Sequence, residues 1–208
     1  MLRPGCLHCA APVTGAGASW GCVVHGPVSP LWTPVESTYD AFVAHLEKAG
    51  EFPTLLPWPL GAGWSVSDFA LVAGERGTLG TLACCSGTSA LDGPVDVFVV
   101  TEEPGTGLGA RVAKLSGPDP VDVGEGPPLT KVRVGSASVP LWAVSTSAAD
   151  EEFDRVVVAG EAAGRWLWMV LRPASAMLLL RDEWILRDVS GLGPPLVEMP
   201  FGGPRPPW

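Results

Sequence analysis

Charge is scarce in this sequence, and positive charge is the scarcest. Of the 208 residues 17% are charged, and 13 Lys and Arg face 22 Asp and Glu, which gives a net charge of −9. Residues 1–40 carry one cation, Arg3, beside the anions Glu36 and Asp40. A nucleic-acid backbone is held by clustered Lys and Arg, so this balance opposes such a partner. We expect a protein partner and no nucleic acid, and the oligomeric state stays open.

Long apolar runs are also missing. No stretch approaches the roughly 18 apolar residues of a membrane-spanning helix, and the run at 166–171 ends at Arg172 and Pro173. Residues 1–5 lead directly to a cysteine without the apolar core of a secretion signal. We therefore expect a cytoplasmic protein that makes no membrane contact.

One tyrosine accompanies nine tryptophans, whereas glycine (26) and proline (22) are abundant. This composition favours short elements, many turns and irregular loops. The length suits a small metal module and one domain of ordinary size. We divide the chain into a zinc-ribbon-like module at 1–30, a domain at 31–190 and a Pro/Gly-rich tail at 191–208, which we expect to be loose.

The strongest chemical signal is a set of three cysteines and one histidine near the start of the chain. Cys6 and Cys9 form a C-x2-C pair, and Cys22 and His25 form a C-x2-H pair after twelve intervening residues. Each short turn can aim two ligands at one ion, and two turns complete the tetrahedral Cys3His set that is common for zinc. Thiolates with one imidazole suit Zn²⁺ better than Mg²⁺ or Ca²⁺.

Other interpretations of this motif stay open. The cysteines could pair by chance or form a disulfide, although a disulfide needs an oxidising compartment. His8, between the first two cysteines, is an alternative fourth ligand to His25. A set of four protein ligands leaves no open position for water, so we expect a structural site. Folding of the small ribbon would then depend on the metal.

Residues 37–49 have the apolar spacing of a helix, with Ser37 as its cap and Gly50 at its end. His45 falls on the polar side of that helix, where we expect contact with solvent. Residues 26–36 are rich in proline and predict an extended linker that Trp32 fastens to the domain. Prolines at 53, 57 and 59 predict an irregular rigid loop that carries Trp58 and Trp64, either as a binding edge or as buried plugs.

Strand patterns follow in the rest of the chain. They cover 65–73, 78–85, 95–101, 131–134, 139–145, 155–159, 165–171 and 184–189, with a short helix or strand at 173–181. Trp166 and Trp168 should share one sheet face, whereas adjacent Cys84 and Cys85 should face opposite sides. Short glycine-containing connections favour antiparallel pairing, so we predict an α+β fold with a mostly antiparallel sheet and two or three helices.

A glycine-rich turn at 105–111 follows the strand at 95–101 and leads to a predicted helix at 107–115. Gly105, Gly107 and Ala110 match a loose G-x-G-x-x-A pattern, but Glu102 and Glu103 stand where a phosphate would approach. The charged residues around this turn could instead form a ligand pocket or an acid–base site. The candidates are Glu102, Glu103, Arg111, Asp119 and Glu161.

Taken together, these motifs resemble an actinobacterial family of uncharacterised proteins with an N-terminal zinc-ribbon-like motif. The resemblance lies in Cys6, Cys9, Trp20, Cys22, His25 and Gly26, and in residues 57–60, 63–64, 107–111, 117–120, 160–164, 166–168 and 182–183. It implies a cytoplasmic protein of such an organism, and it brings no activity.

No catalytic triad or nucleophile elbow is visible, since His45 is the sole histidine outside the metal motif. We therefore predict a non-enzymatic binding or adaptor protein with a structural zinc site. Trp58, Trp64 or Trp20 would anchor the partner, because aromatic side chains contribute much of the binding energy at interfaces. The alternative is a small-ligand binder or enzyme with a pocket at residues 105–111.

Overall fold

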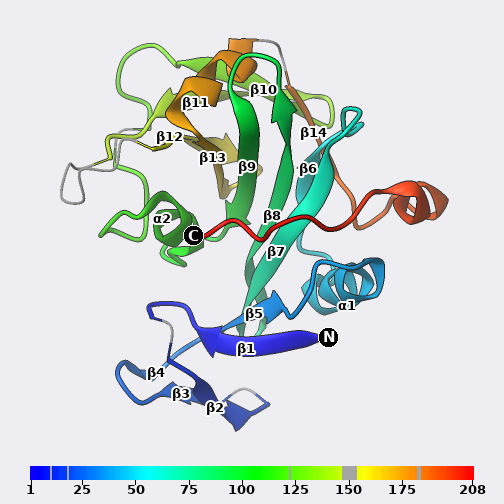
Figure 1. Ribbon diagram of the computed structural model, residues 1–208. Helices are drawn as coiled ribbons and strands as arrows, with labels where there is room; N and C mark the ends of the chain where they lie inside the picture. Colours follow the sequence, from blue (N-terminus) through cyan, green and yellow to red (C-terminus); the bar gives the residue numbers. More distant parts are fainter. Residues whose placement is uncertain (10, 18, 122, 147–153, 182–183) are drawn as a thin grey trace.

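The computed structural model describes residues 1–9, 11–17, 19–121, 123–146, 154–181 and 184–208; Figure 1 shows their arrangement. Asp182 and Glu183, the last pair of the family resemblance, lie outside these residues. The strands are β1 Leu2–Cys6, β2 Val13–Ala16, β3 Ser19–Cys22, β4 Gly26–Pro27, β5 Pro30–Pro34, β6 Leu55–Pro57, β7 Ser65–Gly74, β8 Gly77–Ser89, β9 Gly93–Glu102, β10 Thr130–Val134, β11 Ala137–Ala143, β12 Val156–Ala162, β13 Arg165–Arg172 and β14 Trp184–Asp188. The helices are α1 Tyr39–Ala49, α2 Leu108–Ala113 and the 3-10 segments η2 Ala174–Arg181 and η3 Pro194–Glu198.

Eleven strands form one large sheet in the order β1-β5-β7-β8-β9-β13-β12-β11-β10-β14-β6, and β2, β3 and β4 form a separate ribbon. Neighbours in the large sheet pair antiparallel, except for the parallel pair β10 and β14. The described residues therefore have an α+β fold with a mostly antiparallel sheet, as the sequence predicts. None of their helices is long and apolar enough to cross a membrane.

Both faces of the central strands are buried. In β9, Phe98 and Val100 belong to the core under α2, whereas Val97 and Val99 belong to the core on the opposite face. Adjacent Cys84 and Cys85 are buried on opposite faces, and Trp166 and Trp168 pack on the same one, as strand alternation predicts. The second face is covered by α1, β6 and the curled half of the sheet, so the central strands contain runs that are buried on both faces.

Proline-rich segments form more regular structure than the sequence indicates. The predicted linker contains β5, which pairs along its length with β1 and briefly with β7. The predicted irregular loop contains β6, an edge strand of three residues that pairs with β14. Proline is tolerated because Pro30 and Pro34 stand at the two ends of β5 and because β6 lies at the sheet edge. Helix α1 begins after Thr38, whose hydroxyl accepts the Ala41 N–H, while the predicted cap Ser37 donates to the Val66 carbonyl.

The expectation that His45 contacts solvent is wrong. Its side chain is fully buried, with Phe42 stacked on the ring and Nε2 3.0 Å from the Thr54 hydroxyl. Burial lowers the pKa of His45 to about 3, so the folded protein holds a neutral imidazole. The helix is covered on this side by the β6 segment, which the helical pattern alone does not show.

The expectation of a loose tail at 191–208 is also wrong. Pro194–Glu198 is a 3-10 helix, and the chain then runs beside β7, where Val66 exchanges backbone hydrogen bonds with Pro200 and Gly202. The last nine residues, 200–208, are called the closing segment below. In Figure 1 this segment crosses the front of the large sheet and ends beside α2.

Replacing His45 tests its burial through the pH dependence of stability. The unfolded histidine binds a proton below its ordinary pKa near 6.5 and the folded one does not, so acidification towards pH 3 destabilises the fold. This contribution reaches about 1.4 kcal/mol per pH unit. His45→Gln removes it, so the free energy of unfolding in urea should fall less between pH 6.5 and 5 than in wild type. Equal slopes for the two proteins would show that His45 titrates normally in the fold.

Candidate metal centre

The four predicted ligands come together at the junction between the ribbon and the large sheet. Cys6 ends β1, Cys9 lies in the turn that follows, Cys22 ends β3, and His25 lies in the turn before β4. One ligand atom from each residue lies within 4.8 Å of all the others. The imidazole of this cluster is His25, and the exposed ring of His8 packs beside it at 5.4 Å between ring centroids.

The spacing between ligand atoms fits one tetrahedral ion. Sγ of Cys9 lies 3.7 Å from Sγ of Cys22, and Nδ1 of His25 lies 3.6 Å from Sγ of Cys6 and 3.7 Å from Sγ of Cys22. A tetrahedron with metal–sulfur bonds of about 2.3 Å and metal–nitrogen bonds of about 2.0 Å has edges of roughly 3.5–3.8 Å. All three cysteines are free thiols at these separations, which are far longer than a disulfide bond.

Backbone N–H groups prepare two of the sulfurs for metal binding. His8 N–H donates to Sγ of Cys6 and Val24 N–H donates to Sγ of Cys22, each at 3.4 Å. The Val24 hydrogen bond lowers the pKa of the Cys22 thiol to about 6, whereas burial raises the pKa of the Cys6 thiol. Since thiolate is the ligand form, the amide contacts favour coordination. The donor set, its spacing and these contacts therefore fit a closed, four-coordinate metal site.

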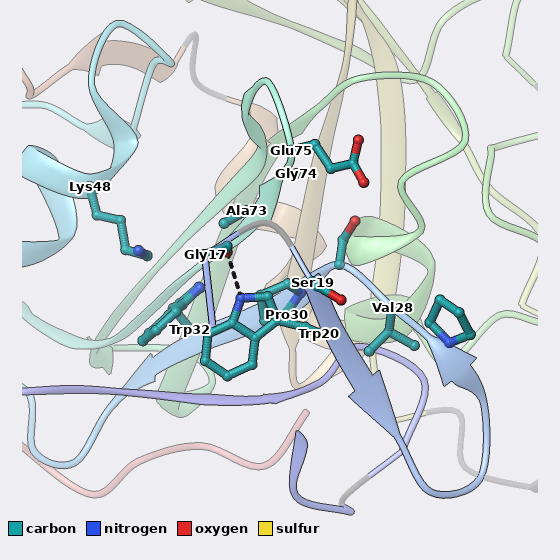
Figure 2. Close-up of a pocket in the computed structure, with 12 residues that line it drawn as sticks. Gly17, Ser19, Trp20, Val28, Pro30, Trp32, Lys48, Ala73, Gly74 and Glu75 are labelled. Atoms are coloured by element: carbon teal, nitrogen blue, oxygen red, sulfur yellow. Dashed lines mark hydrogen bonds between the residues drawn. The ribbon is translucent and has the colours of Figure 1, made fainter. Parts of the chain in front are cut away.

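The ribbon has little else to hold it together. Its buried apolar cluster consists of Cys6, Val13 and Cys22, two of which are ligands. The ribbon rests on the large sheet through Trp20, whose ring meets that of Trp32 edge to face at 5.5 Å. Figure 2 shows these rings at a cavity of about 430 Å³ between the ribbon and the β7–β8 turn, with Lys48 over Trp32 at 4.0 Å. Trp20, which the sequence offers as a partner anchor, thus packs the ribbon onto Trp32 of the large sheet.

Arg111 connects the metal centre to α2. Its Nη1 donates to the carbonyls of Cys6, at 3.3 Å, and Leu7, at 2.5 Å, within the first ligand turn. Burial lowers the pKa of Arg111 and the thiolates of Cys6 and Cys9 oppose that change, so the side chain stays a cation. A divalent ion with three thiolates and one imidazole carries a net charge of −1. Arg111 therefore holds the backbone of the first ligand turn, and its cation would offset the charge of a metal bound there.

Glu102 is buried and occupies the position where the glycine-rich turn could have held a phosphate. Its carboxylate accepts the N–H of Leu108, at 2.6 Å, and of Gly109, at 3.1 Å, at the first turn of α2. Burial raises the pKa of Glu102 to about 7, and these two amides oppose the shift. The amides that a nucleotide phosphate would need are thus already paired within the chain.

The other charged candidates have structural partners around the same turn or lie at its edge. Glu103 pairs with Arg165 at 2.8 Å. Asp119 accepts the N–H of Gly105 at 2.7 Å and the indole N–H of Trp166 at 2.9 Å. Glu161 is exposed on β12. The structure therefore brings Glu102, Glu103 and Asp119 to the β9–α2 connection, whereas Arg111 is directed to the metal loop.

Trp58 and Trp64 line a separate apolar cavity of about 390 Å³ on the opposite face of the sheet. Both side chains are half-buried, so they are neither free anchors nor complete plugs. Trp184 and Leu179 form its other walls with Ile185, which is 47% exposed on β14. We call this set the aromatic cavity. Sequence analysis missed Trp184 and Ile185 because the pairing of β14 with β6, which is distant in the sequence, brings them beside Trp58 and has no local signal.

A further cluster that sequence analysis missed surrounds Asp68 on β7. This carboxylate is buried in a strand that is otherwise largely apolar, and it accepts hydrogen bonds from Arg205 and Trp208. Burial raises the pKa of Asp68, and the Arg205 cation opposes that change. A lone acid in an apolar run is a signal that a basic partner exists, but it does not identify the partner.

Arg111→Ala tests the link between α2 and the metal centre. Loss of the guanidinium leaves two partly buried carbonyls without a donor and removes a compensating charge, so metal affinity should fall about tenfold or more. Competition with a chromogenic chelator measures the affinity. Arg133→Ala, at an exposed position on the distant strand β10, is the matched control and should bind metal as wild type does. Equal affinities for Arg111→Ala and Arg133→Ala would contradict this link.

Comparison with known proteins gives a family and no activity. The chain matches the family of unknown function DUF6758 over residues 2–207. Neither a curated protein nor a solved structure matches it. The family match covers the metal centre, the large sheet and nearly all of the closing segment. The chain therefore belongs to this family of unknown function.

Proposed function

We propose that the chain is a non-enzymatic, zinc-dependent adaptor protein of the cytoplasm. Zinc would have a structural role in it, and the aromatic cavity would bind a protein partner. The observation that carries the zinc assignment is the closed set of four ligand atoms with tetrahedral spacing. Three thiolates with one imidazole favour zinc among the common divalent ions, and reduced thiolates favour a reducing compartment.

The aromatic cavity supports the binding part of the proposal. It joins three tryptophans with an exposed isoleucine, and half-buried indole rings offer a large contact area at low entropic cost. The alternative, a ligand or enzymatic pocket at residues 105–111, has less support because Glu102 already occupies the turn amides. A metal site with four protein ligands leaves no open position for a catalytic water, which favours an adaptor over an enzyme.

Metal analysis of the purified protein tests the zinc assignment. Wild type and His8→Gln should each contain one zinc per chain, because His8 lies outside the ligand cluster. His25→Gln should bind zinc far more weakly, and Cys6→Ser/Cys9→Ser should lose it, since each variant removes donors from a closed site. Full zinc content in His25→Gln, or its loss in His8→Gln, would contradict the ligand assignment.

Affinity capture followed by a binding assay with the purified partner tests the adaptor function. Ile185→Glu places a carboxylate at an exposed wall of the aromatic cavity and should weaken binding about tenfold or more. Leu91→Glu is the matched control, since Leu91 is 82% exposed in the β8–β9 turn and the charge change is identical. The control should bind as wild type does. A partner that both variants retain equally would place the contact elsewhere, and the absence of any partner would oppose the adaptor function.

A further inference from the structure

The closing segment is held by the buried carboxylate of Asp68, which needs hydrogen-bond donors as partners. Oδ2 of Asp68 accepts Nε–H of Arg205 and the indole N–H of Trp208, each at 2.7 Å. The Asp68 side chain has 0% exposure in the structure. A buried ion pair contributes little net stability compared with apolar packing, but it penalises a segment that lacks the matching cation. We call the surroundings of Asp68 that hold Arg205 and Trp208 the slot; its carboxylate matches an arginine followed three residues later by a tryptophan.

Other contacts of this segment complete the slot. Arg205 also donates to the Pro34 carbonyl at 3.2 Å, and Arg172 donates to the Pro207 carbonyl at 2.8 Å. Trp208 packs against the core on this face, with the Arg111 guanidinium 5.4 Å from its ring. These contacts use groups of the segment that any peptide with the same side chains could supply.

The end of the closing segment, residues 204–208, is joined to β7 less regularly than its start. Gly202 and Gly203, with φ values of 118° and 97°, separate it from the backbone bonds to Val66, and proline at 204, 206 and 207 cannot donate ladder hydrogen bonds. A cavity of about 310 Å³ remains between it and the metal loop, lined by Gly5, Cys6 and Cys9 on the metal side. The Arg205 side chain is 43% exposed. Terminal segments that lie outside the strand ladder and keep exposed side chains open at a lower free-energy cost than core strands.

We propose that the slot around Asp68 is a recognition site for an extended, proline-rich segment of a partner protein that carries Arg-x-x-Trp, and that residues 204–208 occupy it in the resting protein. The charge of Asp68 complements the arginine, and a proline-rich backbone loses little entropy on binding. The inference rests on the proposed adaptor function. It adds a second binding surface, for which residues 204–208 compete with the partner.

Peptide binding in trans tests the slot in the full-length chain. Arg205→Ala/Trp208→Ala weakens the resident segment, and a fluorescein-labelled peptide with the sequence of residues 202–208 is then titrated while anisotropy is measured. The double variant should bind the peptide at least ten times more tightly than wild type, in which the resident segment competes. A peptide with alanine in place of arginine should not bind. Adding Asp68→Asn to the double variant should cost about thirtyfold or more in affinity.

A second measurement keeps the test decisive if the double variant fails to fold. In wild type the indole N–H resonance of Trp208, assigned with Trp208→Phe, should move to its solvent-exposed position when excess peptide is added. An unmoved resonance, or binding in the double variant that Asp68→Asn leaves unchanged, would overturn the proposal. If wild type forms dimers and Asp68→Asn abolishes them, the occupant of the slot would be a second copy of this chain, and the proposal of a different partner protein would be overturned. If the peptide tests fail but partner capture still depends on Ile185, the recognition site at Asp68 would be rejected and the adaptor function would be retained.

Discussion

The physical constraint on which this structure depends is the small apolar content of the ribbon. Strands of two to four residues cannot bury enough surface to pack as a unit, and two of the three buried apolar residues in the ribbon cluster are metal ligands. A metal bound by the Cys3His cluster would replace a hydrophobic core, because the free energy of metal binding is also free energy of folding. The consequence reaches the large sheet, since Cys6 is the last residue of β1.

Buried polar contacts join the metal loop after β1 to segments that are distant in the sequence. Arg111 on α2 donates hydrogen bonds to the backbone of the first ligand turn. Glu102, at the end of β9, accepts hydrogen bonds from the amides at the start of α2. Asp68 holds the closing segment, whose Trp208 returns to Arg111. Each contact satisfies a group that would be costly to bury alone, so each fixes a position more than it adds net stability. The metal loop, α2 and the end of the closing segment at Trp208 therefore form one connected region on the face of the sheet that α2 covers.

Local patterns predicted the features that local chemistry determines. The C-x2-C and C-x2-H pairs identified four residues that the structure brings together, and alternation placed Cys84 and Cys85 on opposite faces. The α+β class followed from short glycine-containing connections between strand patterns. Features that depend on distant packing were missed: helical spacing placed His45 on a polar face, but the segment leading into β6 covers it. The proline-rich end was expected to be loose because its partner, Asp68, lies 137 residues earlier.

The measurement that tests the central claim most directly is amide hydrogen exchange on metal-loaded and metal-stripped protein. If coordination holds the ribbon, stripping should abolish protection in β2 and β3, reduce it in β1 and in the first turn of α2, and leave β8, β9 and β13 protected. Unchanged protection in the ribbon after complete removal of the metal would contradict the account. It would show that the ribbon is held by packing against Trp32 and the sheet instead.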